Sequence, residues 1–138
     1  MNMKNLEHIG IAVKSIEASI PLFSKLFNTE PYKEEFVAGE KVRTLFFNCG
    51  NVKIELLEST TEDGAIAKFI EKRGEGIHHL AFEVEDINQE MQRMKEEGFT
   101  LLNEQPKEGA DHKLICFLHP KTTGGTLIEL CQENKKGS

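Results

Sequence analysis

The chain lacks several features that would place it in a class of protein at once. It has only three cysteines, Cys49, Cys116 and Cys131, with no CxxC spacing, so the sequence indicates neither a disulfide framework nor a zinc knuckle. No apolar run approaches the roughly 20 residues of a membrane span, and the apolar stretch near the start is too short for a signal peptide. We therefore expect a cytoplasmic protein with no membrane partner, whose cysteines are reduced and mostly serve in packing.

The chain also lacks an excess of basic residues. Its formal net charge is −6 and its pI is near 5.4, and without a long basic run nucleic acid is not an expected partner. Hydrophobic residues make up 38% and charged residues 29%, which is ordinary for a folded protein. A length of 138 residues suffices for a sizeable core, so we predict a single domain over residues 1–138.

An internal repeat is the most informative feature that the sequence does contain. The stretch "HIGIAVKSIEASIPLFSKLF" from His8 aligns with "HLAFEVEDINQEMQRMKEEG" from His79, an offset of 71 residues (from 8 to 79). In both copies an alternating, strand-like run precedes a helix-capping residue, Ser15 or Asp86, and a pattern of apolar residues at helical spacing. The second helix is expected to stop at Gly98, as a C-terminal capping glycine.

Three further strand-like runs follow each predicted helix, so each copy reads as βαβββ. The expected strands are residues 32–37, 42–47 and 52–57, then 100–103, 114–118 and 126–130. The last strands, "NVKIELLE" and "GTLIELCQ", align at an offset of 74 residues (from 55 to 129), and the extra residues fall in the turn "HPKTTGG". The expected fold is α+β, with two tandem βαβββ modules forming one curved, partly open barrel around a metal site. The modules cover about residues 5–58 and 76–132, and a linker with a short helix covers 59–75.

The repeat singles out four residues that can carry chemistry. His8 and His79 occupy equivalent positions, as do Glu55 and Glu129, and each glutamate is flanked by large apolar residues. A carboxylate on an apolar strand is costly unless it is paired or bound to a metal. We therefore predict that all four bind one divalent ion of the Co, Ni, Mn, Fe or Zn group, with coordination positions left open for catalysis.

The remaining histidines have simpler expected roles. Adjacent strand residues point to opposite faces, so His78 cannot lie where His79 does, and we expect a partly exposed neighbour that orients a ligand or lines the cleft. His119 precedes Pro120 and is expected to cap that turn, whereas His112 lies in the polar stretch "EGADHK" and is expected to be solvated.

The motifs "HIGIAV", "IELLE", "GIHHLAFEV" and "FLHPKTTGGTLIELCQ" resemble those of the vicinal oxygen chelate (glyoxalase/bleomycin resistance/dioxygenase) superfamily. Within it the chain is similar to the methylmalonyl-CoA epimerase family from about Leu6 to Gln132. The part that is specific to this family consists of "KFIEKRGEGIHH" and of "FLHPK" before "GG-x-L-x-E-L". "HIGIAV" alone indicates only the superfamily.

This resemblance implies an isomerase that interconverts (R)- and (S)-methylmalonyl-CoA by moving the proton on the α carbon. It implies metal ligation by His8, His79 and Glu129, with Glu55 at a fourth position where some members have glutamine. Glu129 and Glu55 are then the expected bases, although some epimerases place a further glutamate where this chain has "KVRTLFFN". The expected contacts to the coenzyme A tail are Lys121, Lys113 and Arg43.

Other readings of the same pattern stay open. A glyoxalase I-type lactoylglutathione lyase uses the same fold and a similar His/Glu ligand set, and a non-catalytic small-molecule-binding member of the fold need not keep the ligands. Ring-cleaving dioxygenases of this fold typically use three protein ligands. We also expect a homodimer, because a half-open sheet leaves edges and apolar surface to cover.

Overall fold

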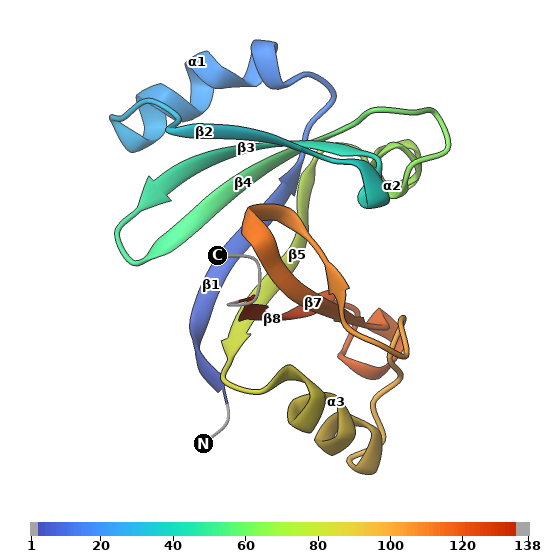
Figure 1. Ribbon diagram of the computed structural model, residues 1–138. Coiled ribbons are helices and arrows are strands. Elements are labelled where there is room, and N and C mark those ends of the chain that lie inside the picture. The colour runs from blue at the N-terminus through green and yellow to red at the C-terminus, as the bar shows by residue number, and fades with distance from the viewer. Residues whose placement is uncertain (1–2, 135–138) are drawn as a thin grey trace. The chain divides into compact units, whose positions relative to one another are not determined.

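A computed structural model describes residues 3–134 of the chain (Figure 1). The described residues form two compact units, one comprising residues 8–78 and the other the segment up to Glu7 together with the chain from His79 onward. The strand that begins the chain therefore contributes to both units. Each unit contains the βαβββ order that the repeat predicts, so the expected α+β fold of two such modules is confirmed.

The first module has four strands in the order β2-β3-β4-β1. Its elements are β1 (Met3–Ala12), α1 (Ile16–Phe27), β2 (Lys33–Val37), the 3₁₀ turn η1 (Ala38–Glu40), β3 (Val42–Cys49), β4 (Val52–Ser59) and, after it, α2 (Ala65–Arg73). β1 is parallel to β4, with Gly10 opposite Glu55, and the other neighbours are antiparallel. Phe46 of β3 is also opposite Glu55.

The second module repeats this arrangement in the order β5-β8-β7-β6. Its elements are β5 (Gly76–Val84), α3 (Ile87–Glu96), β6 (Lys107–Glu108), η2 (Ala110–His112), β7 (Lys113–Leu118), η3 (Pro120–Thr122) and β8 (Ile128–Glu133). β5 is parallel to β8, with Ala81 opposite Glu129, and β7 is antiparallel to β8, with Phe117 opposite Glu129.

The prediction of a strand at residues 100–103 is wrong. An isolated bridge joins Leu101 to Leu118 there, and the strand that pairs with the other edge of β7, opposite β8, is the two-residue β6. The reason is the side chain of Asn103, whose Oδ1 accepts a hydrogen bond from the Phe117 N–H at 3.1 Å. Its Nδ2 donates to the carbonyl of Gln105 at 2.7 Å. An asparagine that bonds backbone groups in this way replaces the ladder of a regular strand.

The two main helices begin in the same way. The Ser15 hydroxyl accepts from the Ala18 N–H, and the Asp86 carboxylate accepts from the Gln89 N–H, each at 3.1 Å. These are the predicted N-caps, which satisfy N–H groups that have no partner inside the helix. Gly98 has φ +95° just after the end of α3, a conformation that suits the glycine expected there.

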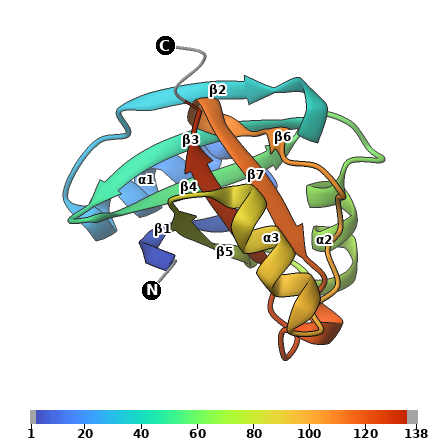
Figure 2. The same cartoon turned by 60° about the horizontal axis from the view of Figure 1, so that its bottom comes forward.

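The two main helices each pack on the strands of their own module. α1 packs against β4, and α3 packs against β7 and β8 (Figures 1 and 2). The first core contains the buried residues Val13, Ile16, Leu45, Phe47, Ile54 and Leu56. The second contains Val84, Ile87, Met91, Met94, Cys116, Leu118 and Leu130. Because strand side chains alternate, the residues between these core positions point to the opposite face of each sheet.

The cysteines differ in burial. Cys116 and Cys131 are buried, whereas Cys49 is exposed where β3 runs past the core toward its hairpin, so only the first two serve in packing as expected. Burial raises the pKa of the Cys116 thiol to about 11 and also raises the pKa of Cys131. The helices between residues 3 and 134 include none that is long and apolar enough to span a membrane.

Candidate metal centre

His8 and Glu55 lie side by side in the first unit. They come from the parallel strands β1 and β4, on the sheet face opposite the core because Ile54 and Leu56 point toward α1. Each is only 4% exposed, and His8 Nδ1 lies 3.2 Å from Glu55 Oε2. A buried imidazole–carboxylate pair therefore stands where the sequence predicts two ligands.

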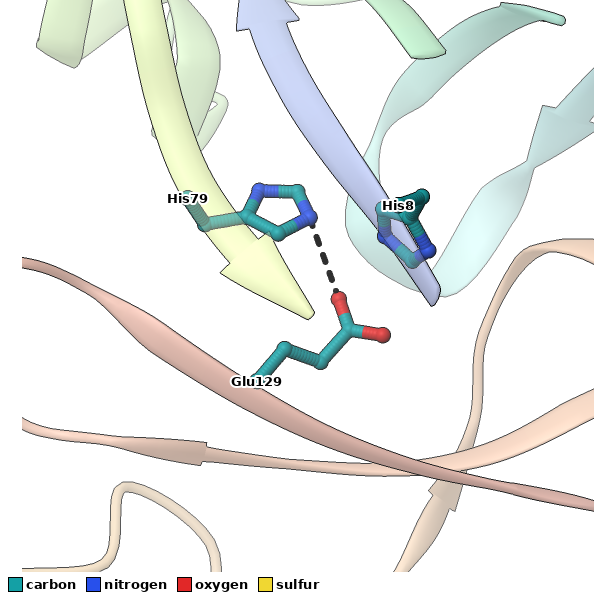
Figure 3. Close-up of side chains that lie close together, drawn as sticks. All are labelled: His8, His79 and Glu129. Carbon is teal, nitrogen blue, oxygen red and sulfur yellow. Dashed lines mark ion pairs between the residues drawn. The ribbon is translucent and has the colours of Figure 1, made fainter. Parts of the chain in front are cut away.

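The second unit contains the equivalent pair. His79 of β5 and Glu129 of β8 are each 4% exposed, and His79 Nε2 lies 3.2 Å from Glu129 Oε1 (Figure 3). They share their sheet face with Ala81, Ile115 and Cys131, which form a small apolar cluster. The alternation that places Leu130 in the core is what turns Glu129 to this side.

The chemistry of these groups fits a divalent ion. Two ligand atoms that each lie about 2.1 Å from an ion at right angles are about 3.0 Å apart, close to the 3.2 Å within each pair. Buried carboxylates also favour a compensating cation. Within each unit, a buried histidine and a buried glutamate therefore offer ligand atoms of the kind that hold such an ion.

Glu7 is a candidate ligand that the sequence reasoning missed. It is 8% exposed, and together with its chain neighbour His8 and with Glu55 it forms a buried group that could hold an ion. Its position in the repeat matches His78, which hides it from a comparison that looks for identical residues. The signal that could have found it is a carboxylate between Leu6 and His8, at the point where strand β1 becomes buried.

Of the remaining histidines, His119 and His112 lie as expected. His78 is half-buried and packs edge-on against Phe69 of α2, with ring centroids 5.0 Å apart, so it points away from the face of His79. The Nδ1 of His119 accepts a hydrogen bond from the Lys121 N–H at 3.0 Å and caps η3. His112 is exposed.

Aromatic rings lie next to both pairs. The ring of Phe117 meets the ring of His79 edge-on, with centroids 5.6 Å apart and planes at 88°. Lys107 Nζ lies 5.9 Å from the centroid of the Phe117 ring. In the first unit Lys33 Nζ lies 5.2 Å from the centroid of Phe46, which is fully buried opposite Glu55. Neither lysine was singled out from the sequence, because these contacts depend on strand pairing.

The three residues expected to contact coenzyme A lie in different settings. Arg43 forms ion pairs with Glu17 and Glu34 at 2.7 Å and with Glu58 at 3.5 Å, and its hydrogen bonds to Glu17 and Glu34 raise the pKa of its guanidinium. Lys113 is 8% exposed, with Nζ 3.8 Å from Glu133. Lys121 is exposed in η3. The structure thus gives Arg43 and Lys113 carboxylate partners within their own units.

Comparison with known proteins identifies the family. The family model described as "Glyoxalase/Bleomycin resistance protein/Dioxygenase superfamily" matches residues 7–117. The chain belongs to this superfamily. That assignment agrees with the resemblance seen in the motifs, and the matched region includes His8, Glu55 and His79.

Relatives named as epimerases match nearly the whole chain. The ethylmalonyl-CoA/methylmalonyl-CoA epimerase of Cereibacter sphaeroides is 40% identical over 92% of this chain and 96% of its own length. The crystal structure of methylmalonyl-CoA epimerase from Mycobacterium tuberculosis has a TM-score of 0.91 at 32% identity, covering 97% of this chain and 91% of that one. A Streptomyces coelicolor methylmalonyl-CoA epimerase variant, solved in complex with 2-nitronate-propionyl-CoA, has a TM-score of 0.89 at 32% identity, covering 96% of both chains.

Proposed function

We propose that this protein is an isomerase that interconverts (R)- and (S)-methylmalonyl-CoA at a divalent metal centre formed by His8, Glu55, His79 and Glu129. The observation that carries the proposal is the recurrence of a buried His–Glu pair, with the same 3.2 Å separation, at equivalent places in two repeats. The similarity to named epimerases over nearly the full length supports the substrate.

The proposal requires the two His–Glu pairs to face a single ion, as in the curved, partly open barrel expected from the sequence. Imidazole and carboxylate ligands suit Co, Ni, Mn or Zn, and we propose a cobalt-type ion. When bound, such an ion polarises the thioester and carboxylate oxygens and stabilises the negative charge that deprotonation creates. The residues themselves supply the ligand atoms and the water-poor surroundings.

Glu129 and Glu55 are the proposed proton carriers. Inversion at the α carbon needs one group that removes the proton from one face and another that returns a proton to the opposite face. The two carboxylates come from separate repeats, which would allow them to approach the carbon from different sides. Their apolar neighbours, including Phe46 and Phe117, exclude water and strengthen the electrostatic interactions of the reacting groups.

The coenzyme A tail is proposed to lie near η3, where Lys121 is exposed and can meet a phosphate. Replacing Lys121 with methionine should weaken the binding of every acyl-CoA equally, because the tail is common to all of them. Isothermal titration calorimetry with two different acyl-CoAs measures this directly.

A homodimer remains a prediction. The first unit exposes Leu22, Leu26 and Phe36, each more than 60% accessible, which is apolar surface that an assembly could cover. Light scattering should then report about twice the chain mass of 15.6 kDa at micromolar concentration. A mass of one chain would exclude the dimer.

The function is tested by proton exchange. In heavy water, protein loaded with Co²⁺ should replace the α-proton of methylmalonyl-CoA with deuterium and should convert one epimer into the other, as followed by NMR. Methylglyoxal with glutathione is the control, since its isomerisation would instead indicate a glyoxalase I-type lyase. Metal-loaded protein that leaves the α-proton untouched would refute the proposal.

A further inference from the structure

We infer that the hydroxyl of Thr44 binds an oxygen of the acyl group in the proposed substrate, either in its free carboxylate or in its thioester carbonyl. The inference rests on the proposed function and adds a substrate-binding residue to it. It concerns the first unit alone, where Thr44 lies in β3 beside the strand that carries Glu55. Thr44 is only 1% exposed, so this hydroxyl is a polar group inside the fold.

Strand pairing places Thr44 on the same face of the sheet as Glu55. Leu45 and Phe47 belong to the core beneath α1, so Thr44 and Phe46 point to the opposite face. Phe46 is directly opposite Glu55, and Thr44 stands two residues before Phe46 in the same strand. Diagonal neighbours of this kind are about 7–8 Å apart. A group bound beside Glu55 can therefore also reach the Thr44 hydroxyl.

The Thr44 hydroxyl forms no hydrogen bond with another of the described residues. Its cross-strand neighbour Glu35 forms an ion pair with Lys33 at 3.4 Å. Every fully enclosed side-chain nitrogen or oxygen between residues 3 and 134 has a hydrogen-bond partner, so the Thr44 oxygen must still border open space. A hydroxyl removed from water without a partner costs free energy. A ligand oxygen that accepts from this hydroxyl supplies the missing hydrogen bond.

The second repeat shows that the fold does not require a hydroxyl at this position. The equivalent residue is Ile115, which stands two residues before the phenylalanine that is opposite the ligand glutamate of β8. It is 4% exposed and belongs to an apolar cluster with Ala81 and Cys131. Because an isoleucine fills this position in one repeat, we assign the threonine of the other repeat to binding rather than to folding.

The test measures binding and stability in the same variant. Thr44→Val replaces the hydroxyl with a methyl group and keeps the branched shape. It should weaken the binding of malonyl-CoA, propionyl-CoA or both by about three- to tenfold, as expected for the loss of one hydrogen bond. The urea midpoint of unfolding should stay the same or rise, because no partner within the protein is lost. Isothermal titration calorimetry on protein loaded with Co²⁺ gives the affinities, and Thr44→Ser, which keeps the hydroxyl, should retain them.

The two thioesters distinguish the two acceptors. Weaker binding of malonyl-CoA alone supports the carboxylate, whereas equal weakening of both supports the thioester carbonyl that they share. Thr122→Val is the matched control for stability. The Thr122 hydroxyl donates to the carbonyl of His119 at 3.0 Å and accepts from the Thr100 N–H at 3.1 Å. Loss of this paired hydroxyl should lower the urea midpoint.

Two outcomes would overturn the inference. Thr44→Val could bind both thioesters as tightly as wild-type protein, or it could lower the urea midpoint as Thr122→Val does, which would show that the hydroxyl serves the fold, for example through a buried water. Failure of the proposed function looks different, because wild-type protein would then fail to exchange the α-proton of methylmalonyl-CoA. Wild-type protein that exchanges the α-proton while Thr44→Val binds normally would reject the threonine alone.

Discussion

The two repeats are most alike where they hold the candidate ligands. In each, the histidine and the glutamate come from neighbouring parallel strands, β1 and β4 or β5 and β8. In each, the strand that carries the glutamate also caps the helix: the N–H of Ile16 donates to Glu58 Oε1 at 2.8 Å, and the N–H of Ile87 donates to Gln132 Oε1 at 2.6 Å. Both capping side chains stand three residues after the glutamate. The helix, the strand and the ligand are thus positioned together.

The repeats differ at their outer strands. β2 pairs with β3 over five residues, whereas β6 pairs with β7 over two. The hairpin before β8 is also longer than the one before β4, because it contains the η3 turn. The comparison shows that the parallel strand pair and its helix carry the site, while the edges are free to differ, since an edge strand has only one neighbour whose pairing it must match.

The largest expected effect comes from removing either histidine. His79→Ala and His8→Ala should each lower Co²⁺ affinity at least about 100-fold, more than the loss of a residue that only hydrogen-bonds a ligand, and should abolish nearly all epimerisation. Equal losses would support a single ion shared by both repeats. Metal titration followed by inductively coupled plasma mass spectrometry on the same samples measures this. Full metal binding by one variant would show that the repeats are not equivalent in ligation.

Substitution of the two glutamates distinguishes a role in metal ligation from a role in proton transfer. Glu129→Gln, compared at equal metal content, should lower turnover at least about 10²-fold, because an amide cannot accept the α-proton. Glu55→Gln should likewise stop inversion, yet the remaining carboxylate should still exchange the α-proton of one epimer with deuterium. NMR resolves exchange from inversion. If fully metallated Glu129→Gln turns over near the parent rate, Glu129 is only a ligand.

A pair of core substitutions compares the stability of the repeats. Leu56 and Leu130 each follow a candidate ligand glutamate, are fully buried and belong to the two helix-covered cores. Replacing either with alanine should lower the free energy of unfolding by about 2–5 kcal/mol, because a cavity remains. Urea denaturation measures both values. A loss below about 1 kcal/mol at one position would show that its core can collapse around the missing side chain.

The helix caps should show the smallest effect. Ser15→Ala and Asp86→Ala each remove an oxygen that accepts one N–H at 3.1 Å, and each should cost about 1 kcal/mol of stability. Comparable costs would extend the similarity of the repeats to their helix starts. Ser15→Asp is the control that retains a capping oxygen, and it should stay near the parent in thermal melts.

The sequence was sufficient to predict the repeat and the helix starts, and it singled out the residues that form the two His–Glu pairs. Period-two alternation turns Glu55 and Glu129 to the face opposite Ile54 and Leu130, and the observed cores contain both of these apolar residues. The capping positions Ser15 and Asp86 also followed from residue type and spacing. These features could be predicted because local backbone geometry fixes which neighbours share a face.

Other features followed from pairings between distant residues. The prediction of a strand at 100–103 was wrong because the Asn103 side chain accepts a hydrogen bond from the N–H of Phe117, fourteen residues away. Glu7 was missed because its significance depends on its neighbours in space rather than on its match in the repeat. The exposure of Cys49 depended on how far β3 extends beyond its core.

The sequence by itself determined the alternation, the caps and the duplicated ligand types, since each arises from interactions within a few residues along the chain. Only the tertiary structure decided that Phe117 lies between Lys107 and His79, and that Lys33 meets Glu35. The physical reason is register: the contacts across a sheet depend on which residues pair between strands, and a shift of one residue would turn every side chain of a strand to the other face.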